Sequence, residues 1–155
     1  SGHGLLWLGE RVGNGTGPEL DVALDPLEGA AICATGAYNA LSIIAIAEPG
    51  GLLRCPDMHM EKIAVGPDGR GVIDLDKSPT ENLRALADAR SVYVEDLTVA
   101  VLDRPRHDKL IEEVRRAGAR IKLLTSGDVS AAIATTKPLA GVDLICDRVL
   151  PLLRD

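Results

Sequence analysis

Aromatic side chains are almost absent from this chain of 155 residues, which has no phenylalanine, one tryptophan and two tyrosines. Proteins that bind single-stranded nucleic acid without reading its sequence stack the bases on aromatic rings, so this scarcity argues against such a function. The core must be built from leucine, isoleucine, valine and alanine instead. That composition suits parallel β-strands covered by helices.

An excess of positive charge is also missing, since the formal net charge is −6 at pH 7. Without a basic field, we expect no nucleic-acid partner. The longest apolar run covers residues 40–47 and includes a serine, whereas a helix needs roughly 20 apolar residues to span a bilayer. The first residues carry no pattern typical of a signal peptide, so we expect a cytoplasmic protein with no membrane contact.

Cysteine is scarce, with Cys33, Cys55 and Cys146 as the three examples. An odd number of widely spaced cysteines fits neither a disulfide framework nor a zinc site. Their apolar neighbours predict reduced thiols in the core, as is usual in the cytoplasm.

Apolar residues make up 46% and charged residues 26% of the chain, which predicts a globular protein of the α/β class. In the first half we predict strands over residues 5–8, 20–24, 38–48, 52–55 and 72–75, with 38–48 as a central strand. Ser78, Pro79 and Glu81 form the start signal of a helix that is expected to reach about residue 89.

Strands and helices alternate regularly after that helix. We predict strands over residues 97–102, 121–124 and 142–146, and helices over 105–117 and 129–136. Such a β-α-β-α-β alternation predicts a Rossmann-like parallel sheet with right-handed crossovers. We therefore divide the chain into a subdomain over residues 1–93, which carries the acidic motif described next, and a β-α-β-α-β subdomain over residues 94–155.

A pair of carboxylates follows the strand expected over residues 20–24. Asp25 and Glu28 lie three positions apart in the segment Asp25-Pro26-Leu27-Glu28-Gly29. Magnesium prefers oxygen ligands and commonly shares them with a substrate phosphate, so this segment is a candidate metal site. An Asp-Pro pair is also a common way to open a structural turn, and the motif alone does not decide between the two interpretations.

Two further polar segments come at the predicted ends of strands. Arg104, Pro105 and Arg106 follow the strand over 97–102, and Ser126, Gly127 and Asp128 follow the strand over 121–124. Ligands of open α/β sheets bind beyond the carboxyl ends of the strands, and arginine binds anionic groups through paired N–H donors. We expect the two segments to lie side by side and to bind an anion, although each by itself is also compatible with plain helix capping.

These motifs are part of a longer resemblance to the class II fructose-1,6-bisphosphatases of the GlpX type, which runs from about residue 5 to residue 145. The residues that carry it form short segments: Leu8–Gly13, Asp25–Gly29, Asn39–Leu41, Pro56–Pro67, Glu81–Leu83, Leu102–His107, Gly118–Arg120 and Gly127–Val129. The resemblance implies a layered, sugar-phosphatase-like α/β sandwich. It also implies hydrolysis of a sugar bisphosphate that depends on Mg²⁺ or Mn²⁺.

The same resemblance implies roles for particular residues. Asp25 and Glu28 would be metal ligands, and the catalytic set would be Asp25, Glu28, His59 and Asp128. The sugar and its phosphates would be contacted by Glu28, Gly29, Ala30, His59, Arg104, Pro105, Arg106, Ser126, Gly127 and Asp128.

The chain also departs from the family pattern, because family members are longer at both ends and carry further metal-ligand carboxylates there. Ala30 stands where the family has threonine, His59 where it has tyrosine, and Ser126 where it has aspartate. Two carboxylates bind magnesium weakly because the ion keeps its waters. We therefore expect a truncated, divergent member whose hydrolytic activity is impaired in the single chain, with metal binding weak or absent unless a partner completes the site.

Two alternatives stay open. One is a repurposed enzyme that uses the same pocket without a metal, with His59, His107 and Asp128 as acid-base candidates. The other is a non-catalytic binding module or a fragment of a longer enzyme. In each case the shortened fold would expose apolar sheet faces, which predicts a homo-oligomer, most simply a dimer.

Overall fold

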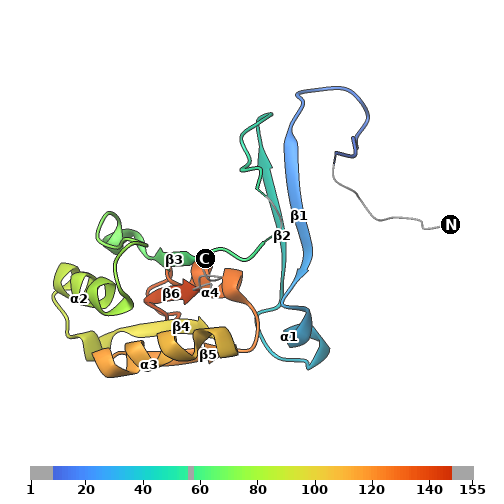
Figure 1. The fold of residues 1–155 in the computed structure, drawn as a ribbon. Coiled ribbons are helices and arrows are strands. Elements are labelled where there is room, and N and C mark those ends of the chain that lie inside the picture. Colours follow the sequence, from blue (N-terminus) through green and yellow to red (C-terminus); the bar gives the residue numbers. More distant parts are fainter. Residues whose placement is uncertain (1–8, 56–57, 148–155) are drawn as a thin grey trace, which may run out of the picture.

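The computed structural model describes residues 9–55 and 58–147, which form a mixed α/β protein (Figure 1). The strands are β1 (Asp21–Glu28), β2 (Leu41–Ala47), β3 (Lys62–Val65), β4 (Thr98–Leu102), β5 (Arg120–Leu124) and β6 (Leu144–Asp147). The α-helices are α1 (Ala30–Ala34), α2 (Pro79–Arg90), α3 (Asp108–Ala117) and α4 (Asp128–Ala134), and the short 3₁₀ turns are η1 (Pro67–Gly69), η2 (Val94–Asp96) and η3 (Pro105–His107). The α/β class is confirmed, while the strand expected over residues 5–8 lies outside the described residues.

Four strands form the main sheet in the order β3-β6-β4-β5. The three strands expected in the second half are present, and β4 runs parallel to both β5 and β6. Strand β3, which the sequence pattern did not predict, joins the other side of β6 in the antiparallel direction. This direction places the start of β3 beside the end of β6.

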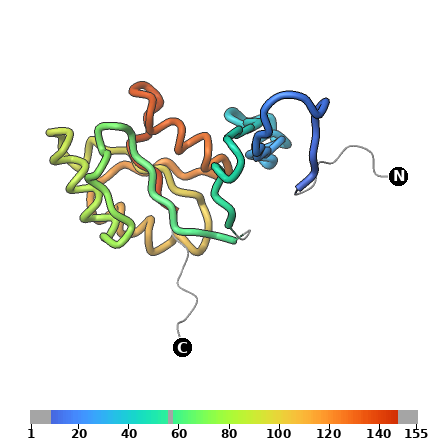
Figure 2. Tube along the Cα trace, turned by 90° about the horizontal axis from the view of Figure 1, so that it is seen from above, coloured from blue at the N-terminus to red at the C-terminus, as the bar shows by residue number. Residues whose placement is uncertain are grey.

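Helices cover both faces of this sheet (Figures 1 and 2). Val99 and Val101 of β4 pack in a large cluster with apolar residues of α2 and α3, whereas Ala100 packs on the other face with Ala131 of α4. Side chains of a strand alternate between the two faces, so the central strand β4 is buried on both sides. That arrangement explains its continuous apolar sequence.

The end signals of the helices work as the sequence predicts. The Ser78 hydroxyl accepts a hydrogen bond from the Glu81 N–H, and the Glu81 carboxylate accepts one from the Ser78 N–H, which completes the capping box of α2. Gly118 follows α3 with a φ of 94°, the left-handed conformation that favours glycine. These local interactions depend on neighbouring residues only, which is why they can be recognised in the sequence.

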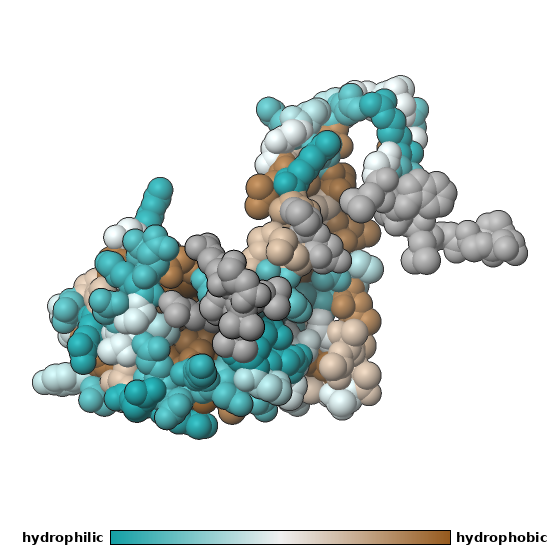
Figure 3. Space-filling model, in the orientation of Figure 1, coloured by the Kyte–Doolittle hydropathy of each residue, from teal (hydrophilic) through white to brown (hydrophobic). Residues whose placement is uncertain are grey.

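Strands β1 and β2 form a separate antiparallel hairpin that stands away from the main sheet (Figure 1). Val22 lies opposite Ile46 and Leu24 lies opposite Ile44, so the four side chains share one face, where they are 49% to 62% exposed. Apolar surface accordingly gathers over the hairpin in Figure 3. The strand predicted over residues 38–48 is present as β2, but its predicted central position was wrong, because an apolar run looks the same whether or not strands and a covering layer flank it.

Two other predictions fail in the described residues, where no strand covers 52–55 or 72–75. Asn82 of α2 explains the second failure, because its side chain takes the backbone hydrogen bonds that a neighbouring strand would otherwise satisfy. Its Oδ1 accepts from the Asp74 N–H at 2.8 Å and its Nδ2 donates to the Asp74 carbonyl at 2.8 Å. A tight turn in which the Gly51 N–H donates to the Glu48 carbonyl at 2.8 Å precedes residues 52–55.

Of the three cysteines, Cys146 is buried, while Cys33 and Cys55 are exposed free thiols. The expectation of three core thiols is therefore corrected for two of them, because apolar neighbours in sequence do not guarantee a covering layer. In the described part of the chain, no helix has the length and apolar character needed to cross a membrane.

Candidate functional site

The carboxyl ends of the parallel strands form one edge of the main sheet, called the carboxyl edge below, where β4 ends at Leu102, β5 at Leu124 and β6 at Asp147. The two polar segments that follow β4 and β5 lie side by side there. Arg104 joins them, since its Nη1 donates to the Asp103 carbonyl and its Nη2 donates to the Thr125 carbonyl, both at 2.8 Å. The structure thus brings together the segments expected to bind an anion.

Helix α1 connects the hairpin to this edge. Gly29, at the start of α1, and Gly127, at the start of α4, both have a positive φ, of 81° and 89°. The buried Ile32 side chain lies between them, and a Cβ added to Gly127 would be only 3.0 Å from the Ile32 Cδ1. Glycine is therefore required at position 127 for both conformation and space. The close approach carries the end of β1 to the turn that follows β5.

Glu28, the last residue of β1, is buried where the hairpin approaches the turn before α4. It is 7% exposed, and its Oε2 is buried without a hydrogen-bond partner. Burial, followed by the negative charges of Asp128 and Asp25, raises the pKa of Glu28 above its ordinary value, and the Val129 backbone N–H opposes this only in part. Glu28 and Asp128 come from distant parts of the sequence and meet as a carboxyl pair.

Asp25 sits differently from Glu28. The acidic segment lies inside β1 rather than in a turn after a shorter strand, and the pairing with β2 shifts register between Asp25 and Glu28. The Asp25 Oδ1 accepts a hydrogen bond from the Leu27 N–H at 3.1 Å, and the residue is exposed. The acidic segment is therefore part of a strand and also contains a local turn, a combination that the sequence pattern did not predict.

The donor set around the acidic segment is too small for a divalent cation. The unpaired Glu28 oxygen is a suitable ligand atom, but within residues 9–55 and 58–147 no three histidine, cysteine, aspartate or glutamate side chains are arranged to hold a metal ion. One or two carboxylates hold magnesium only together with waters and a substrate phosphate. The described residues by themselves therefore do not fit a complete metal site.

The remaining predicted site residues have simpler surroundings. His59 is exposed in the connection between β2 and β3, and no hydrogen bond or ion pair ties it to the rest of the described chain. Ala30 and Pro105 are exposed first residues of α1 and η3, while Ser126 is half-buried before α4. His59, Ala30 and Pro105 are thus predicted site residues for which no hydrogen bond or ion pair to the others is present in the described chain.

A second group of charged residues at the carboxyl edge was predicted only in part, because the sequence pointed to Arg106 and His107 but not to Lys62 or Asp147. The His107 side chain is fully buried, with Nδ1 2.7 Å from the Leu102 carbonyl and Nε2 2.7 Å from the Asp147 Oδ1. Lys62 and Arg106 each place a nitrogen 3.5 Å from the Asp147 carboxylate. The pairing of β3 with β6 puts Lys62 opposite Asp147. The sequence does not reveal this pairing, so it could not place the two residues together.

Electrostatics favours the ionised form of Asp147. Burial by itself would raise the pKa of Asp147, but the hydrogen bond and charge of His107, with the charges of Lys62 and Arg106, hold that pKa below its ordinary value. His107 has no exposed nitrogen, so it does not fit the role of an acid or base for a bound substrate.

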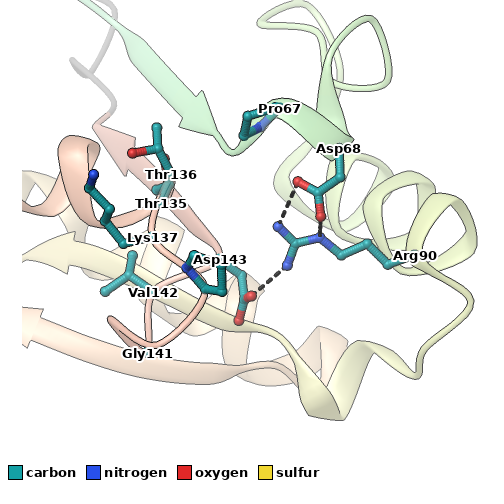
Figure 4. A pocket seen from close by; sticks show the side chains of 10 residues that line it. Pro67, Asp68, Arg90, Thr135, Thr136, Lys137, Gly141, Val142 and Asp143 are labelled. Atoms are coloured by element: carbon teal, nitrogen blue, oxygen red, sulfur yellow. Dashed lines mark hydrogen bonds and ion pairs between the residues drawn. The ribbon is translucent and has the colours of Figure 1, made fainter.

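A pocket of about 300 Å³ lies at the opposite edge of the sheet (Figure 4). Arg90 spans it between two carboxylates, with Nε 2.5 Å from the Asp68 Oδ2 and Nη1 2.5 Å from the Asp143 Oδ1. Asp143 also accepts a hydrogen bond from the Thr98 N–H, which fixes the amino ends of β4 and β6. Because Arg90 is paired with both carboxylates, these three side chains stabilise the fold at this edge.

Comparison with known proteins finds a matching family model and similar curated proteins. The model of the family described as bacterial fructose-1,6-bisphosphatase, glpX-encoded, matches residues 2–147. Relatives from Prochlorococcus marinus (strain NATL1A), Synechococcus sp. (strain RCC307) and Parasynechococcus marenigrum (strain WH8102) are each named D-fructose 1,6-bisphosphatase class 2/sedoheptulose 1,7-bisphosphatase.

Each relative is 45% identical over 130 residues, which cover 84% of this chain and 39% of the relative. The chain therefore spans about two fifths of the length of the curated relatives that it matches. Since the family match extends over nearly all of the residues described above, the chain belongs to the glpX-encoded bacterial fructose-1,6-bisphosphatase family.

Proposed function

We propose that this chain forms the sugar-phosphate-binding edge of a class 2 fructose-bisphosphatase-type fold and that its substrate is a sugar bisphosphate. The observation that carries the proposal is the meeting of three segments at the carboxyl edge. Arg104 bridges the ends of β4 and β5, and the Glu28 carboxylate lies beside Asp128. Cationic and acidic groups that meet beyond parallel strands suit a phosphorylated sugar, whose phosphates need N–H donors and whose hydroxyls need acceptors.

The proposed roles follow from these positions. Arg104 and Arg106 bind phosphate oxygens, and Asp128 accepts hydrogen bonds from sugar hydroxyls. The other proposed contacts, which line the substrate or reach it from exposed loops, are Gly29, Ala30, His59, Pro105, Ser126 and Gly127. Glu28 contributes a carboxyl group at the point where the hairpin approaches the sheet.

Hydrolysis is proposed to be impaired in the isolated chain. The relatives' name indicates bisphosphatase activity, but the donor atoms that the described residues offer around Asp25 and Glu28 do not make a complete metal site. We propose that Mg²⁺ or Mn²⁺ binds weakly or not at all unless a partner chain adds ligands. Phosphoryl transfer depends chiefly on positioning and charge stabilisation, so a missing ligand set removes most of the rate.

Release of inorganic phosphate from fructose 1,6-bisphosphate tests this function. The purified chain is expected to bind the sugar bisphosphate in calorimetry, with binding weakened about tenfold by Arg104→Ala because a charge-assisted contact is lost, and to release phosphate slowly in the presence of Mn²⁺. Absence of sugar-bisphosphate binding would contradict the proposal. Rapid release that EDTA abolishes would contradict the proposed impairment, and full activity of Asp25→Ala would remove that residue from the site.

A second function has one specific observation in its favour. The raised pKa of Glu28 keeps a carboxylic acid protonated closer to neutral pH than usual, as a general acid requires. A metal-free reaction on a related substrate would use Glu28 as the acid, beside Asp128. Turnover that survives a chelator and is lost in Glu28→Gln would favour this function over the first.

Three further parts of the proposal concern the whole protein. We propose that the main sheet and hairpin belong to a layered, sugar-phosphatase-like sandwich with a Rossmann-like second subdomain, divided near residue 93. We also propose that the protein acts in the cytoplasm, where exposed thiols such as those of Cys33 and Cys55 stay reduced. The exposed apolar face of the hairpin supports a homodimer, because such faces are normally covered.

A further inference from the structure

Asp147 is surrounded by two cationic side chains, those of Lys62 and Arg106, and by the imidazole ring of His107. Lys62 begins β3, Arg106 and His107 belong to η3, and Asp147 ends β6. The Asp147 side chain is 7% exposed, whereas that of Lys62 is 54% exposed. A buried carboxylate therefore lies beneath a cation that faces solvent.

The buried ring of His107 fixes this carboxylate. Both ring nitrogens face oxygen acceptors at 2.7 Å, namely the Leu102 carbonyl and the Asp147 carboxylate. The paired residues of β4 and β6 are Val99 with Leu144 and Ala100 with Ile145, so His107 links the strand ends beyond these pairs.

The two cations keep capacity for a ligand. Their distances of 3.5 Å to Asp147 exceed the roughly 2.7–2.9 Å of a strong charge-assisted hydrogen bond. The Arg106 Nε is buried without a partner. Lys62 and Arg106 carry two positive charges against the one negative charge of Asp147, so positive charge is in excess at this end of the carboxyl edge.

We propose that Asp147 is a positioning residue that holds Lys62 and Arg106 side by side as an oxyanion-binding pair for a phosphoryl group. The proposal rests on the proposed function, because it assigns one phosphate of the sugar bisphosphate to this end of the carboxyl edge. Lys62 is a binding residue, and Asp147 acts through it and through Arg106 without touching the ligand. The antiparallel direction of β3 makes this possible, since it brings Lys62 to the ends of the parallel strands.

Titration with inorganic phosphate, followed by NMR signals of the arginine side chains, tests the pair. Lys62→Ala is expected to raise the Kd for phosphate about tenfold, because one charge-assisted hydrogen bond is lost. Lys137→Ala removes the same charge at the opposite edge, beside the pocket of Arg90, and is the matched control. Its Kd is expected to equal that of the unmodified protein.

Asp147→Asn separates positioning from simple electrostatics. Removing a negative charge near the anion would tighten phosphate binding if charge alone mattered. Loss of positioning has the opposite effect, and it is expected to raise the Kd for phosphate about fivefold. The ring N–H signals of His107 report whether its second hydrogen bond is lost in the variant. Where Asp147→Asn does not fold, Arg106→Lys replaces it, since lysine keeps the charge but not the Nε donor, and weaker binding is again expected.

Fructose 1,6-bisphosphate serves as a second probe, so that the two proposals fail separately. Unchanged phosphate affinity in Lys62→Ala, tighter binding in Asp147→Asn, or no phosphate binding by the unmodified protein would each overturn the oxyanion pair. If the sugar bisphosphate still binds in those cases and Arg104→Ala weakens it, the proposed function stands. If neither probe binds the unmodified protein, both proposals fall.

Discussion

At the scale of the residue, the buried carboxyl group of Glu28 is expected to lower the stability of the fold while serving the candidate site. Its pKa is raised by burial and by the charges of Asp128 and Asp25, so the folded state holds its proton more tightly than the unfolded chain does. Stability then falls as the pH rises through the interval between the unfolded and folded pKa values of this carboxyl. Such a cost is expected where a residue is kept for function.

Glu28→Gln is accordingly expected to stabilise the protein by about 1 kcal/mol at neutral pH, because it removes a buried negative charge that lies beside two other carboxylates. The gain should vanish as the pH falls and the glutamate of the unmodified protein becomes protonated. Thermal unfolding at a series of pH values, in EDTA, measures it. Asp25→Asn is the control, since that side chain is exposed, and a gain equal to that of Glu28→Gln would show that burial is not the cause.

Helix α2 illustrates, at the scale of the element, what a sequence can predict. Its start and end depend on Ser78, Glu81 and their neighbours, and the parallel strands β4, β5 and β6 depend on short apolar runs between clear helix signals. Strand β3 and helix α1 escaped prediction because β3 is only four residues long and α1 five. Both take their stability from distant partners, β6 and Gly127, which no local pattern reveals.

The two ends of α2 offer a matched pair of substitutions. Ser78→Ala removes the side-chain oxygen that accepts from the Glu81 N–H and should destabilise the protein by about 1 kcal/mol. Ser91→Gly should stabilise it by up to about 1 kcal/mol, because Ser91 has a φ of 55° after the last turn. Chemical denaturation measures both, and a shift of the same sign in the two variants would contradict these roles of the two serines.

The contact between α1 and α4 can be tested in the same way. Gly127→Ala combines backbone strain with a Cβ only 3.0 Å from the Ile32 Cδ1, whereas Gly36→Ala at a φ of 66° meets nothing within 4 Å. Both variants should lose about 1 kcal/mol from strain, and Gly127→Ala should lose about 1 kcal/mol more from crowding. Equal losses in denaturation would mean that the hairpin and the sheet do not meet as described.

The candidate site was predictable only in part, for reasons that belong to the whole molecule. Arg104 and the turn before α4 could be placed together because the ends of adjacent parallel strands meet by rule. The approach of Glu28 to Asp128, and of Lys62 to Asp147, required the path of the hairpin and the direction of β3. Neither follows from periodicity, and His59 was included by family resemblance alone.

The apolar face of the hairpin governs the expected assembly. A two-stranded hairpin is marginal in water unless its apolar face is covered, and Leu24 and Ile44 are paired on that face. Light scattering is expected to give a dimer, which Ile44→Lys should dissociate. Ala45→Lys, on the opposite face of the same strand, should leave the dimer intact. A monomeric unmodified protein, or equal dissociation by the two lysines, would refute the proposed dimer.

The carboxyl edge gathers groups from β3, η3, β6, the turn before α4 and the end of β1, so it exists only while all of them are folded together. A compound that fits it must therefore delay heat unfolding by an amount that grows with its concentration relative to its Kd. A panel of sugars carrying zero, one or two phosphates would rank by melting temperature. The compound with the greatest protection would identify the natural metabolite class without any assay of turnover.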